Sequence, residues 1–273
     1  MSELPTTIMQ ARTFLFVPGD RPDRFSKAAA SGADAMVIDL EDAVAAEDRD
    51  QARSNVQSWL EAGHEVVVRV NAFGDPDHDK DIAALRGHTV GVMLAKADAV
   101  VALQTLTGVL GQECPIIALI ESASGILAAA EIAATPGVAR LAFGSIDYAA
   151  ELGVEPTSRE AMAFARGALV VASAAAGISP PIDGVTTAIT PTTAVSEDVR
   201  YGRSIGFAGK LCIHPSQIEP VHRAYTPSDE DVEWATRVVD ASKRGAVTQL
   251  DGAMVDLPVV LRARRILVDA GRR

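Results

Sequence analysis

Short apolar runs alternate with helical patterns along most of the chain. The clearest run, residues 115–120, carries no charge and is too short to span a membrane. The stretch that contains it is bounded by Pro115 and Gly125. Such a run is typical of a strand covered on both faces, as in a parallel sheet. The Ala-rich segment that follows, residues 126–134, has a helical pattern. We count eight strands in all, most of them separated by helical segments.

This alternation predicts a parallel sheet, and eight strand–helix units in about 250 residues predict a (β/α)8 TIM barrel, with an open doubly wound sheet as the alternative. No Gly-rich dinucleotide or phosphate-loop signature follows the first strand, residues 13–17. The rhythm changes near the end, where residues 228–243 are helical and residues 245–254 form a polar link to a last helix. We therefore predict a barrel catalytic domain over residues 1–227 and a C-terminal helical extension over residues 228–273.

Composition narrows the class of protein. Hydrophobic residues make up 48% and charged residues 22%, which fits a globular protein. The net charge of -11 argues against a nucleic-acid partner, because phosphates demand a basic face. Cys114 and Cys212 lie beside or inside apolar strands, which suits buried thiols in a reducing compartment. The first 12 residues lack the apolar core of a signal peptide and no apolar run is long enough for a membrane span, so we expect a cytoplasmic protein.

Two acids follow successive predicted strands. Glu121 comes directly after residues 115–120, and Asp147 lies just beyond the strand at residues 140–144. Because the carboxyl ends of parallel strands meet at one edge, the two carboxylates can share a divalent cation. With no His or Cys beside them, they suit Mg²⁺ better than Zn²⁺. Proton transfer, as in glycosidases, is the alternative, and it is disfavoured because Arg69 nearby would lower the carboxyl pKa values.

Further charged residues lie at the same end of the predicted sheet. Asp39, Glu41 and Asp42 follow the strand at residues 35–38, a density of acids that favours a functional loop. Arg69 interrupts a β-branched strand, and a buried Arg is rare unless paired. We therefore expect Arg69 to face carboxylates, either those of this protein or those of a substrate.

A basic helix start follows the first strand. Asp20 can cap this helix, and Arg21 and Lys27 lie near its first turn, where a phosphate site and a solvated basic face are both open. His214 stands at a strand end, where a site role and a packing role are equally open. The other histidines, including His78, fall in loops or helices and are expected to face solvent.

Several motifs in order make the chain resemble a known family. They are Val17-Pro18-Gly19-Asp20-Arg21-Pro22, Asp39-Leu40-Glu41-Asp42-Ala43-Val44, Val68-Arg69-Val70-Asn71, Glu121-Ser122-Ala123, Phe143-Gly144-Ser145-Ile146-Asp147, Gly209-Lys210, Ile213-His214-Pro215 and Met254-Val255-Asp256. Together they resemble the citrate lyase β-subunit-like (CitE-like) proteins of the HpcH/HpaI aldolase/citrate lyase superfamily, over nearly the full chain.

The resemblance implies a TIM barrel that cleaves or forms a carbon–carbon bond in a hydroxy-dicarboxylyl-CoA, such as malyl-CoA, citramalyl-CoA or citryl-CoA. Cleavage of this substrate would yield a CoA thioester and a keto acid. It also implies Mg²⁺ as cofactor and a homotrimer or hexamer as assembly. By position, Glu121 and Asp147 are the implied metal ligands. Arg69 is implied to hold the thioester or keto-acid oxygen, and Glu41 and Asp42 to support the waters of the metal.

The resemblance assigns four further residues. Arg21 and Lys27 are implied to meet the CoA phosphates, and His214 belongs to a matching motif and is grouped with these cofactor-binding residues. Asp256 is the implied acid or base, reaching in from a neighbouring subunit. Two other functions stay open: a metal-dependent aldolase acting on free 2-keto acids without CoA, and a non-catalytic barrel subunit.

The chain departs from the family at two places. It has Leu94-Ala95-Lys96 where relatives usually read Leu-Pro-Lys, and residues 186–191 lack the acid that relatives tend to carry. These differences affect the choice of substrate more than the metal site.

Overall fold

The predicted TIM barrel is confirmed by the computed structural model, which describes residues 4–243 and 248–271. Eight parallel strands close into a barrel, because β8 pairs with β1 as well as with β7. The strands are β1 (Thr13–Pro18), β2 (Ala35–Asp39), β3 (Val67–Val70), β4 (Gly91–Leu94), β5 (Ile116–Ile120), β6 (Val138–Phe143), β7 (Ile182–Asp183) and β8 (Gly209–Cys212). Most of these segments are rich in β-branched or aliphatic side chains and are buried, as strands covered by helices must be.

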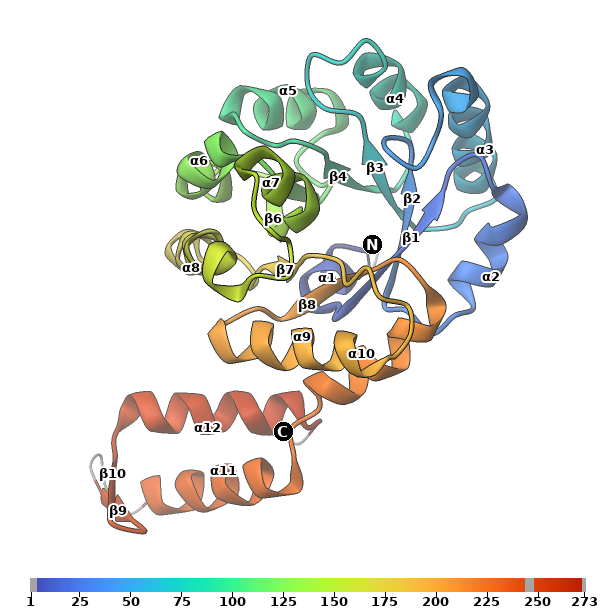
Figure 1. Ribbon diagram of the computed structural model, residues 1–273. Helices are drawn as coiled ribbons and strands as arrows, with labels where there is room; N and C mark the ends of the chain where they lie inside the picture. The colour runs from blue at the N-terminus through green and yellow to red at the C-terminus, as the bar shows by residue number, and fades with distance from the viewer. Residues whose placement is uncertain (1–3, 244–247, 272–273) are drawn as a thin grey trace. The chain divides into compact units, whose positions relative to one another are not determined.

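Helices link the strands and lie around the outside of the barrel (Figure 1). They are α2 (Phe25–Ala29), α3 (Arg49–Glu61), α4 (His78–Leu85), α5 (Val100–Leu110), α6 (Ala123–Ala133), α7 (Ser145–Leu152), α8 (Arg159–Ala176), α9 (Thr193–Ile205) and α10 (Ile218–Tyr225), with short 3₁₀ helices η1 (Pro22–Arg24), η2 (Ala46–Asp48) and η3 (Pro215–Gln217). Their ends follow local rules. Ser158 caps α8 with its side chain, and Gly177 ends that helix in the left-handed conformation.

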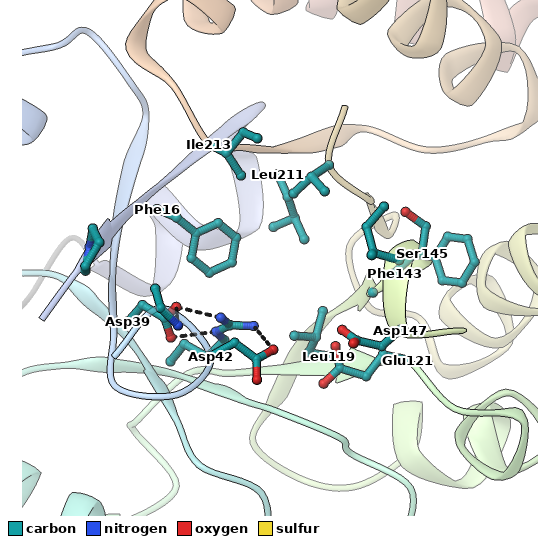
Figure 2. A pocket seen from close by; sticks show the side chains of 16 residues that line it. Phe16, Asp39, Asp42, Leu119, Glu121, Phe143, Ser145, Asp147, Leu211 and Ile213 are labelled. Atoms are coloured by element: carbon teal, nitrogen blue, oxygen red, sulfur yellow. Dashed lines mark hydrogen bonds and ion pairs between the residues drawn. The ribbon is translucent and has the colours of Figure 1, made fainter. Parts of the chain in front are cut away.

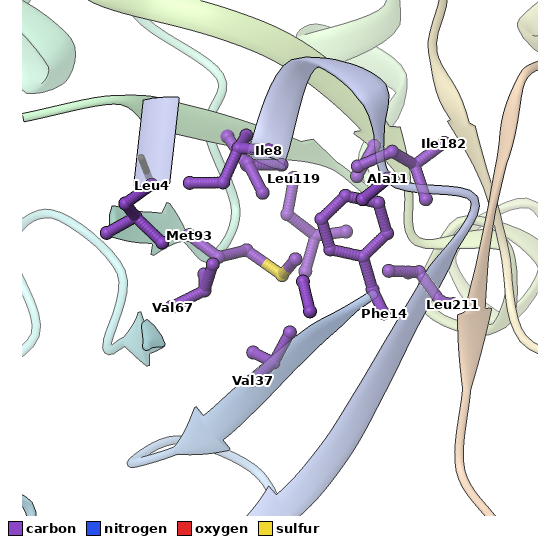
Figure 3. Close-up of a cluster of buried hydrophobic side chains, with 13 residues drawn as sticks. Leu4, Ile8, Ala11, Phe14, Val37, Val67, Met93, Leu119, Ile182 and Leu211 are labelled. Carbon is purple, nitrogen blue, oxygen red and sulfur yellow. The ribbon is translucent and has the colours of Figure 1, made fainter. Parts of the chain in front are cut away.

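The barrel interior is filled by side chains from every strand (Figure 3). These side chains pack with residues of an additional N-terminal helix, α1 (Leu4–Gln10), which the apolar pattern did not predict. The cluster comprises Leu4, Ile8, Ala11, Phe14, Ala35, Val37, Val67, Met93, Ile117, Leu119, Ala142, Ile182 and Leu211. Arg140 fixes α1 in this position, because its Nη1 donates hydrogen bonds to the carbonyls of Ile8 and Ala11 at the end of that helix. The end of the barrel that α1 covers is therefore a packed core, and the opposite end is where a site can form.

The chain divides into two compact units, Met1–Val221 and His222–Arg273. The second unit contains α11 (Asp229–Ser242) and α12 (Leu257–Asp269), which pack through a core that includes Ala235, Val238 and Val260. Part of the predicted polar link, residues 244–247, lies outside the described residues. The rest of it contains an antiparallel hairpin of β9 (Thr248–Leu250) and β10 (Ala253–Val255). The contribution of this unit to a neighbouring subunit stays a prediction.

The predicted capped helix after the first strand takes a different form. A 3₁₀ turn, η1, precedes the short helix α2, and the side chain of Asp20 accepts no capping hydrogen bond. Pro22 still occupies the first turn, where its missing N–H costs nothing. In the ranges that the structure covers, no helix combines the length and apolar character needed to cross a bilayer.

Candidate active site

A cavity of about 450 Å³ opens at the carboxyl ends of the barrel strands (Figure 2). The residues around it belong to, or directly follow, seven of the eight strands, all except β4. They are Phe16, Pro18, Asp39, Asp42, Ala43, Arg69, Leu119, Glu121, Phe143, Gly144, Ser145, Ile146, Asp147, Val185, Leu211 and Ile213. TIM-barrel enzymes place their chemistry at this end of the barrel, so the cavity is the candidate active site.

Arg69 is buried and bonded to the protein's own acids. Its partner Asp39 lies directly opposite it in the register between β2 and β3. Nε of Arg69 donates to Oδ1 of Asp39 at 2.7 Å and Nη2 donates to Oδ2 at 2.5 Å, while Nη1 lies 3.0 Å from Oε2 of Glu41. The guanidinium also lies over the ring of Phe16. Burial lowers the pKa of Arg69, but the hydrogen bonds and charge of Asp39, with the charge of Glu41, outweigh it and raise the pKa above its ordinary value.

Glu41 joins Arg69 to a second cation. Its side chain is 4% exposed, and its Oε1 accepts a hydrogen bond from Nζ of Lys96. Burial raises the pKa of Glu41, although the charge of Arg69 and the hydrogen bond from Lys96 act in the opposite direction. Asp42 is half exposed at the rim, with Oδ2 3.7 Å from Nη1 of Arg69 and Oδ1 3.9 Å from Nζ of Lys96.

Glu121 and Asp147 lie beside each other in the cavity, with their carboxylates on the same side (Figure 2). Glu121 follows β5 and is 4% exposed, and Asp147 lies in the first turn of α7. One oxygen of Glu121, Oε1, accepts the backbone N–H of Lys96 at 2.8 Å. Only glycine fits at position 144, since a Cβ there would lie 2.3 Å from the Cβ of Glu121. Burial, then the charges of Glu41 and Asp147, raise the pKa of Glu121 to about 8.

The charges in this group do not balance, since five carboxylates accompany two cations. The carboxylates are those of Asp39, Glu41, Asp42, Glu121 and Asp147, and the cations are Arg69 and Lys96. No cluster of three or more His, Cys, Asp or Glu side chains arranged to hold a metal occurs in the described part of the chain. Mg²⁺, however, is usually held by one or two carboxylates together with water and substrate oxygens. The expectation that Arg69 lowers the carboxyl pKa values is wrong for Glu121, because burial and the charges of Glu41 and Asp147 outweigh the effect of Arg69. The paired carboxylate oxygens of Glu121 and Asp147 still fit Mg²⁺ by ligand type.

Three residues predicted to bind the cofactor do not line the cavity. Arg21 forms an exposed ion pair with Asp23 beside η1, and Lys27 is exposed on α2. His214 follows β8 and caps η3, with its ring Nδ1 at 2.7 Å from Oγ of Ser216. Contact of these side chains with CoA phosphates stays a prediction.

Asp256 belongs to the second unit. It precedes α12 and its side chain accepts a hydrogen bond from the backbone N–H of Val259 at 3.3 Å, so it serves as the N-cap of that helix. This capping role is a local structural role, and a catalytic role of Asp256 stays a prediction.

Gln217 was missed by the sequence analysis although it braces one wall of the cavity. It is fully buried, its Oε1 accepts the N–H of Ile213 at 2.9 Å, and its Nε2 donates to the carbonyl of Thr186 at 2.8 Å. It therefore ties the segment after β7 to the segment after β8. No sequence signal marks such a residue, because its partners are backbone groups and one of them is 31 positions away.

The expectation that His78 faces solvent is wrong. His78 is 3% exposed, and its ring Nδ1 lies 2.7 Å from the carbonyl oxygen of Asn71. This contact joins the first residue of α4 to the residue that directly follows β3. Buried ring nitrogens need such a partner.

A closed parallel barrel with a cluster of acids at the carboxyl ends of its strands defines a TIM-barrel protein with an acidic candidate site. The sequence profile of the HpcH/HpaI aldolase/citrate lyase family matches residues 12–215, and that of the C-C bond lyases of the TIM-barrel fold matches residues 172–270. The chain belongs to the HpcH/HpaI aldolase/citrate lyase family, as the resemblance predicted.

Individual relatives extend over almost the whole chain. A citrate lyase subunit beta-like protein of Mycobacterium tuberculosis is 38% identical over 267 residues, which cover 94% of this chain and 95% of the relative. A (3S)-malyl-CoA thioesterase of Cereibacter sphaeroides is 32% identical over 270 residues, covering 95% and 94%. The crystal structure of CitE from Mycobacterium tuberculosis in complex with magnesium, acetoacetate and coenzyme A has a TM-score of 0.86 at 36% identity and covers 97% of this chain and 100% of that one.

Proposed function

We propose that this protein is a Mg²⁺-dependent carbon–carbon lyase that cleaves or forms a hydroxy-dicarboxylyl-CoA thioester. The observation that carries the proposal is the pair of Glu121 and Asp147 beside Arg69 in one cavity. Membership of the aldolase/citrate lyase family supports it, as does the similarity to a structure that contains magnesium, acetoacetate and coenzyme A.

In the proposed reaction, the bond between the carbinol carbon and the methylene carbon next to the thioester breaks. The hydroxyl proton passes to a base, the hydroxyl oxygen becomes the keto oxygen, and the bonding electron pair moves onto the thioester fragment as an enolate, which then takes up a proton. Mg²⁺ would supply Lewis-acid polarisation of the carboxylate and hydroxyl oxygens of the substrate.

The residues of the chain have separate parts in this scheme. Glu121 and Asp147 hold the cation, and Glu41 and Asp42 accept hydrogen bonds from water beside them. Arg69 stabilises the negative charge that develops on the thioester or keto-acid oxygen. Its pairing with Asp39 fixes the guanidinium before the reaction begins, and preorganised charge of this kind needs no rearrangement in the transition state.

The remaining predicted residues belong to the thioester and the assembly. Arg21, Lys27 and His214 are proposed to bind the CoA portion outside the cavity, near the first turn after β1 and the segment after β8. Asp256 is proposed to protonate the enolate from a neighbouring subunit of a trimer or hexamer. An acid supplied late would also screen the enolate from water.

The test is a screen of malyl-CoA, citramalyl-CoA and citryl-CoA with and without Mg²⁺, in which keto acid, acetyl-CoA and free CoA are each quantified. Formation of keto acid and acetyl-CoA supports the lyase. Free CoA with hydroxy acid and no keto acid would indicate a thioesterase instead. If none of the CoA thioesters reacts and CoA does not raise the melting temperature of the protein, while free 2-keto acids do react, the proposal gives way to an aldolase without CoA.

Two variants test the metal pair. Glu121→Ala and Asp147→Ala should each abolish Mg²⁺-dependent turnover. Asp147→Ala should leave the melting temperature nearly unchanged because Asp147 is exposed, whereas Glu121→Ala should lower it without unfolding the protein, because the N–H of Lys96 loses its buried acceptor. The matched control is Asp240→Ala, which removes a carboxylate that is 60% exposed on α11 and should change neither turnover nor melting temperature. Near-normal activity in either cavity variant would refute the metal assignment.

A further inference from the structure

Asp147 lies in the first turn of α7, a helix that begins without a side-chain cap. The N-cap residue is Gly144, which has no side chain to bond the free N–H groups of the helix start. The direction of this turn therefore depends on the segments packed against it. Figure 2 shows Phe143 and Ser145 on the same side of the cavity as Asp147 and Glu121.

The residue after β7 packs tightly against the start of α7. A Cβ added at Gly184 would lie 2.2 Å from Oγ of Ser145, 2.8 Å from its Cβ and 2.9 Å from the carbonyl oxygen of Phe143. Glycine is the residue that allows so close an approach of the backbone. The backbone at Gly184 therefore limits where Ser145, the first residue of α7, can lie, and Asp147 follows two positions later.

Backbone pairing in the barrel ends before it reaches Gly184. The strand β7 has two residues, Ile182 and Asp183. Within the described chain it pairs with β6 at one position, through Ile182, and with β8 at two. Gly184 lies beyond these paired residues, so its position depends on other contacts.

Those contacts come from a buried ion pair between α8 and β7. Oδ1 of Asp183 accepts the N–H of Gly184 at 3.0 Å and also accepts Nε–H of Arg166 at 3.0 Å. The side chains of Arg166 and Asp183 are 10% and 1% exposed. Nζ of the buried Lys210 lies 3.9 Å from the other oxygen of Asp183. Such a pair resists displacement, because breaking it leaves an uncompensated charge in the interior.

Arg166 also supports the far side of the first turn of α7. Its guanidinium lies over the ring of Phe143, 5.4 Å from the ring centroid. Phe143 in turn packs edge to face with Tyr148, the residue after Asp147, with ring centroids 5.5 Å apart. The turn that carries Asp147 is therefore held from both sides, and both routes of contact lead back to Arg166.

We propose that Arg166 and Asp183 are positioning residues for Asp147, because they fix the first turn of α7 against the end of β7. This inference rests on the proposed function, in which Asp147 and Glu121 hold Mg²⁺. Arg166 and Asp183 do not line the cavity, so they act on the cation through the direction of the Asp147 carboxylate. A small shift of that carboxylate weakens binding, because Mg²⁺ demands near-ideal octahedral geometry.

The first experiment compares two buried arginines by titration calorimetry with Mg²⁺, well below the melting temperature. Arg166→Lys keeps the charge but cannot keep both the bond to Asp183 and the contact with Phe143. We expect the dissociation constant for Mg²⁺ to rise at least about tenfold. The matched control is Arg53→Lys, because Arg53 donates to the buried Asp81 at 3.0 Å and neither residue lines the cavity. This control should lower the melting temperature and leave the dissociation constant unchanged.

The outcomes separate positioning from general stability. An unchanged dissociation constant in Arg166→Lys overturns the inference and leaves the proposed function standing. An equal rise in Arg53→Lys also overturns it, because any loss of stability would then weaken the metal site. A wild-type protein that binds no Mg²⁺ overturns the proposed metal site itself, and the inference with it.

Two variants at the contact provide the second test and keep the buried ion pair. Gly184→Ala should raise the Mg²⁺ dissociation constant at least about tenfold, because its Cβ displaces the start of α7. Adding Ser145→Gly removes two of the three atoms that this Cβ meets, so the double variant should bind Mg²⁺ more tightly than Gly184→Ala. A purely structural role predicts no such rescue, because a further glycine in a helix lowers stability. Unchanged binding in Gly184→Ala, or a double variant that binds no better, overturns the inference.

Discussion

Replacing Arg69 by lysine separates the shape of this side chain from its charge. Arg69 makes two hydrogen bonds to Asp39, at 2.7 and 2.5 Å, and a third contact to Glu41 at 3.0 Å. A lysine ammonium keeps the charge but cannot form the parallel pair to one carboxylate. Arg69→Lys should therefore lower both stability and turnover.

The size of the stability loss follows from the contacts that disappear. Lysine can keep one of the charged contacts and loses about two, and each hydrogen bond to a charged group contributes roughly 1.5–3 kcal/mol. Since the charge is retained, we take the lower end, about 3 kcal/mol, which is also the lower end for a broken buried ion pair. For a chain of this size that corresponds to a fall in melting temperature of roughly 6–12 °C.

The catalytic loss is measured separately. Removal of one preorganised donor from an oxyanion site lowers kcat by about 100-fold or more, and we expect a similar loss with the best thioester from the screen. Stability is followed by thermal denaturation and urea titration, and kcat is measured well below the melting temperature of the variant. Arg237→Lys is the matched control, because Arg237 pairs with Asp251 where the two side chains are 47% and 59% exposed, and its cost should stay below about 0.5 kcal/mol.

The results distinguish three accounts of Arg69. Loss of both stability and kcat supports a planar guanidinium that both pairs with Asp39 and stabilises developing charge. A lowered melting temperature with unchanged kcat reduces Arg69 to a structural partner of Asp39. Unchanged stability and kcat would refute any need for the planar fork.

Three further predictions concern pH, the thiols and the assembly. Burial and neighbouring acids raise the pKa of Glu121 from 4.5 to about 8, so the metal-free fold favours the protonated carboxyl. The stability that the protonated carboxyl gives to the metal-free fold is lost as the pH rises through that value, and the deprotonated form is the one that binds Mg²⁺. The rise in melting temperature caused by Mg²⁺ should therefore grow between about pH 5.5 and pH 8.5, and a pH-independent rise contradicts this. Burial raises the pKa of Cys114 to about 11 and that of Cys212 to about 12, so iodoacetamide at about pH 8 should label both thiols in urea and neither in the native protein, as mass spectrometry can check. Co-expression of Asp256→Ala with Glu121→Ala, each inactive alone, should restore activity at about a quarter of the sites if Asp256 acts in a neighbouring subunit, whereas demonstrably mixed oligomers that stay inactive exclude that arrangement.

The order of strands and the position of the acids were within reach of sequence reasoning. Residues 115–120 form a continuous apolar run that ends at Glu121, and the strand before Asp147 is apolar over residues 141–143. Strand–helix alternation forces parallel pairing, and parallel pairing brings the carboxyl ends of the strands together. The apolar pattern therefore determined both the barrel and the end of it at which these two acids lie.

The partners of each side chain were decided by the tertiary structure. The sequence predicted that Arg69 needs carboxylates, but only the register of β2 and β3 selects Asp39. The N–H of Lys96 that binds Glu121, the bridge that Gln217 makes between two loops, and the burial of His78 all involve backbone groups, which look alike at every position in a sequence. The packing of α1 into the barrel likewise depends on Arg140, more than 100 residues away along the chain. Apolar periodicity reports which face of an element is buried, whereas hydrogen bonds between distant segments depend on how the closed barrel aligns them.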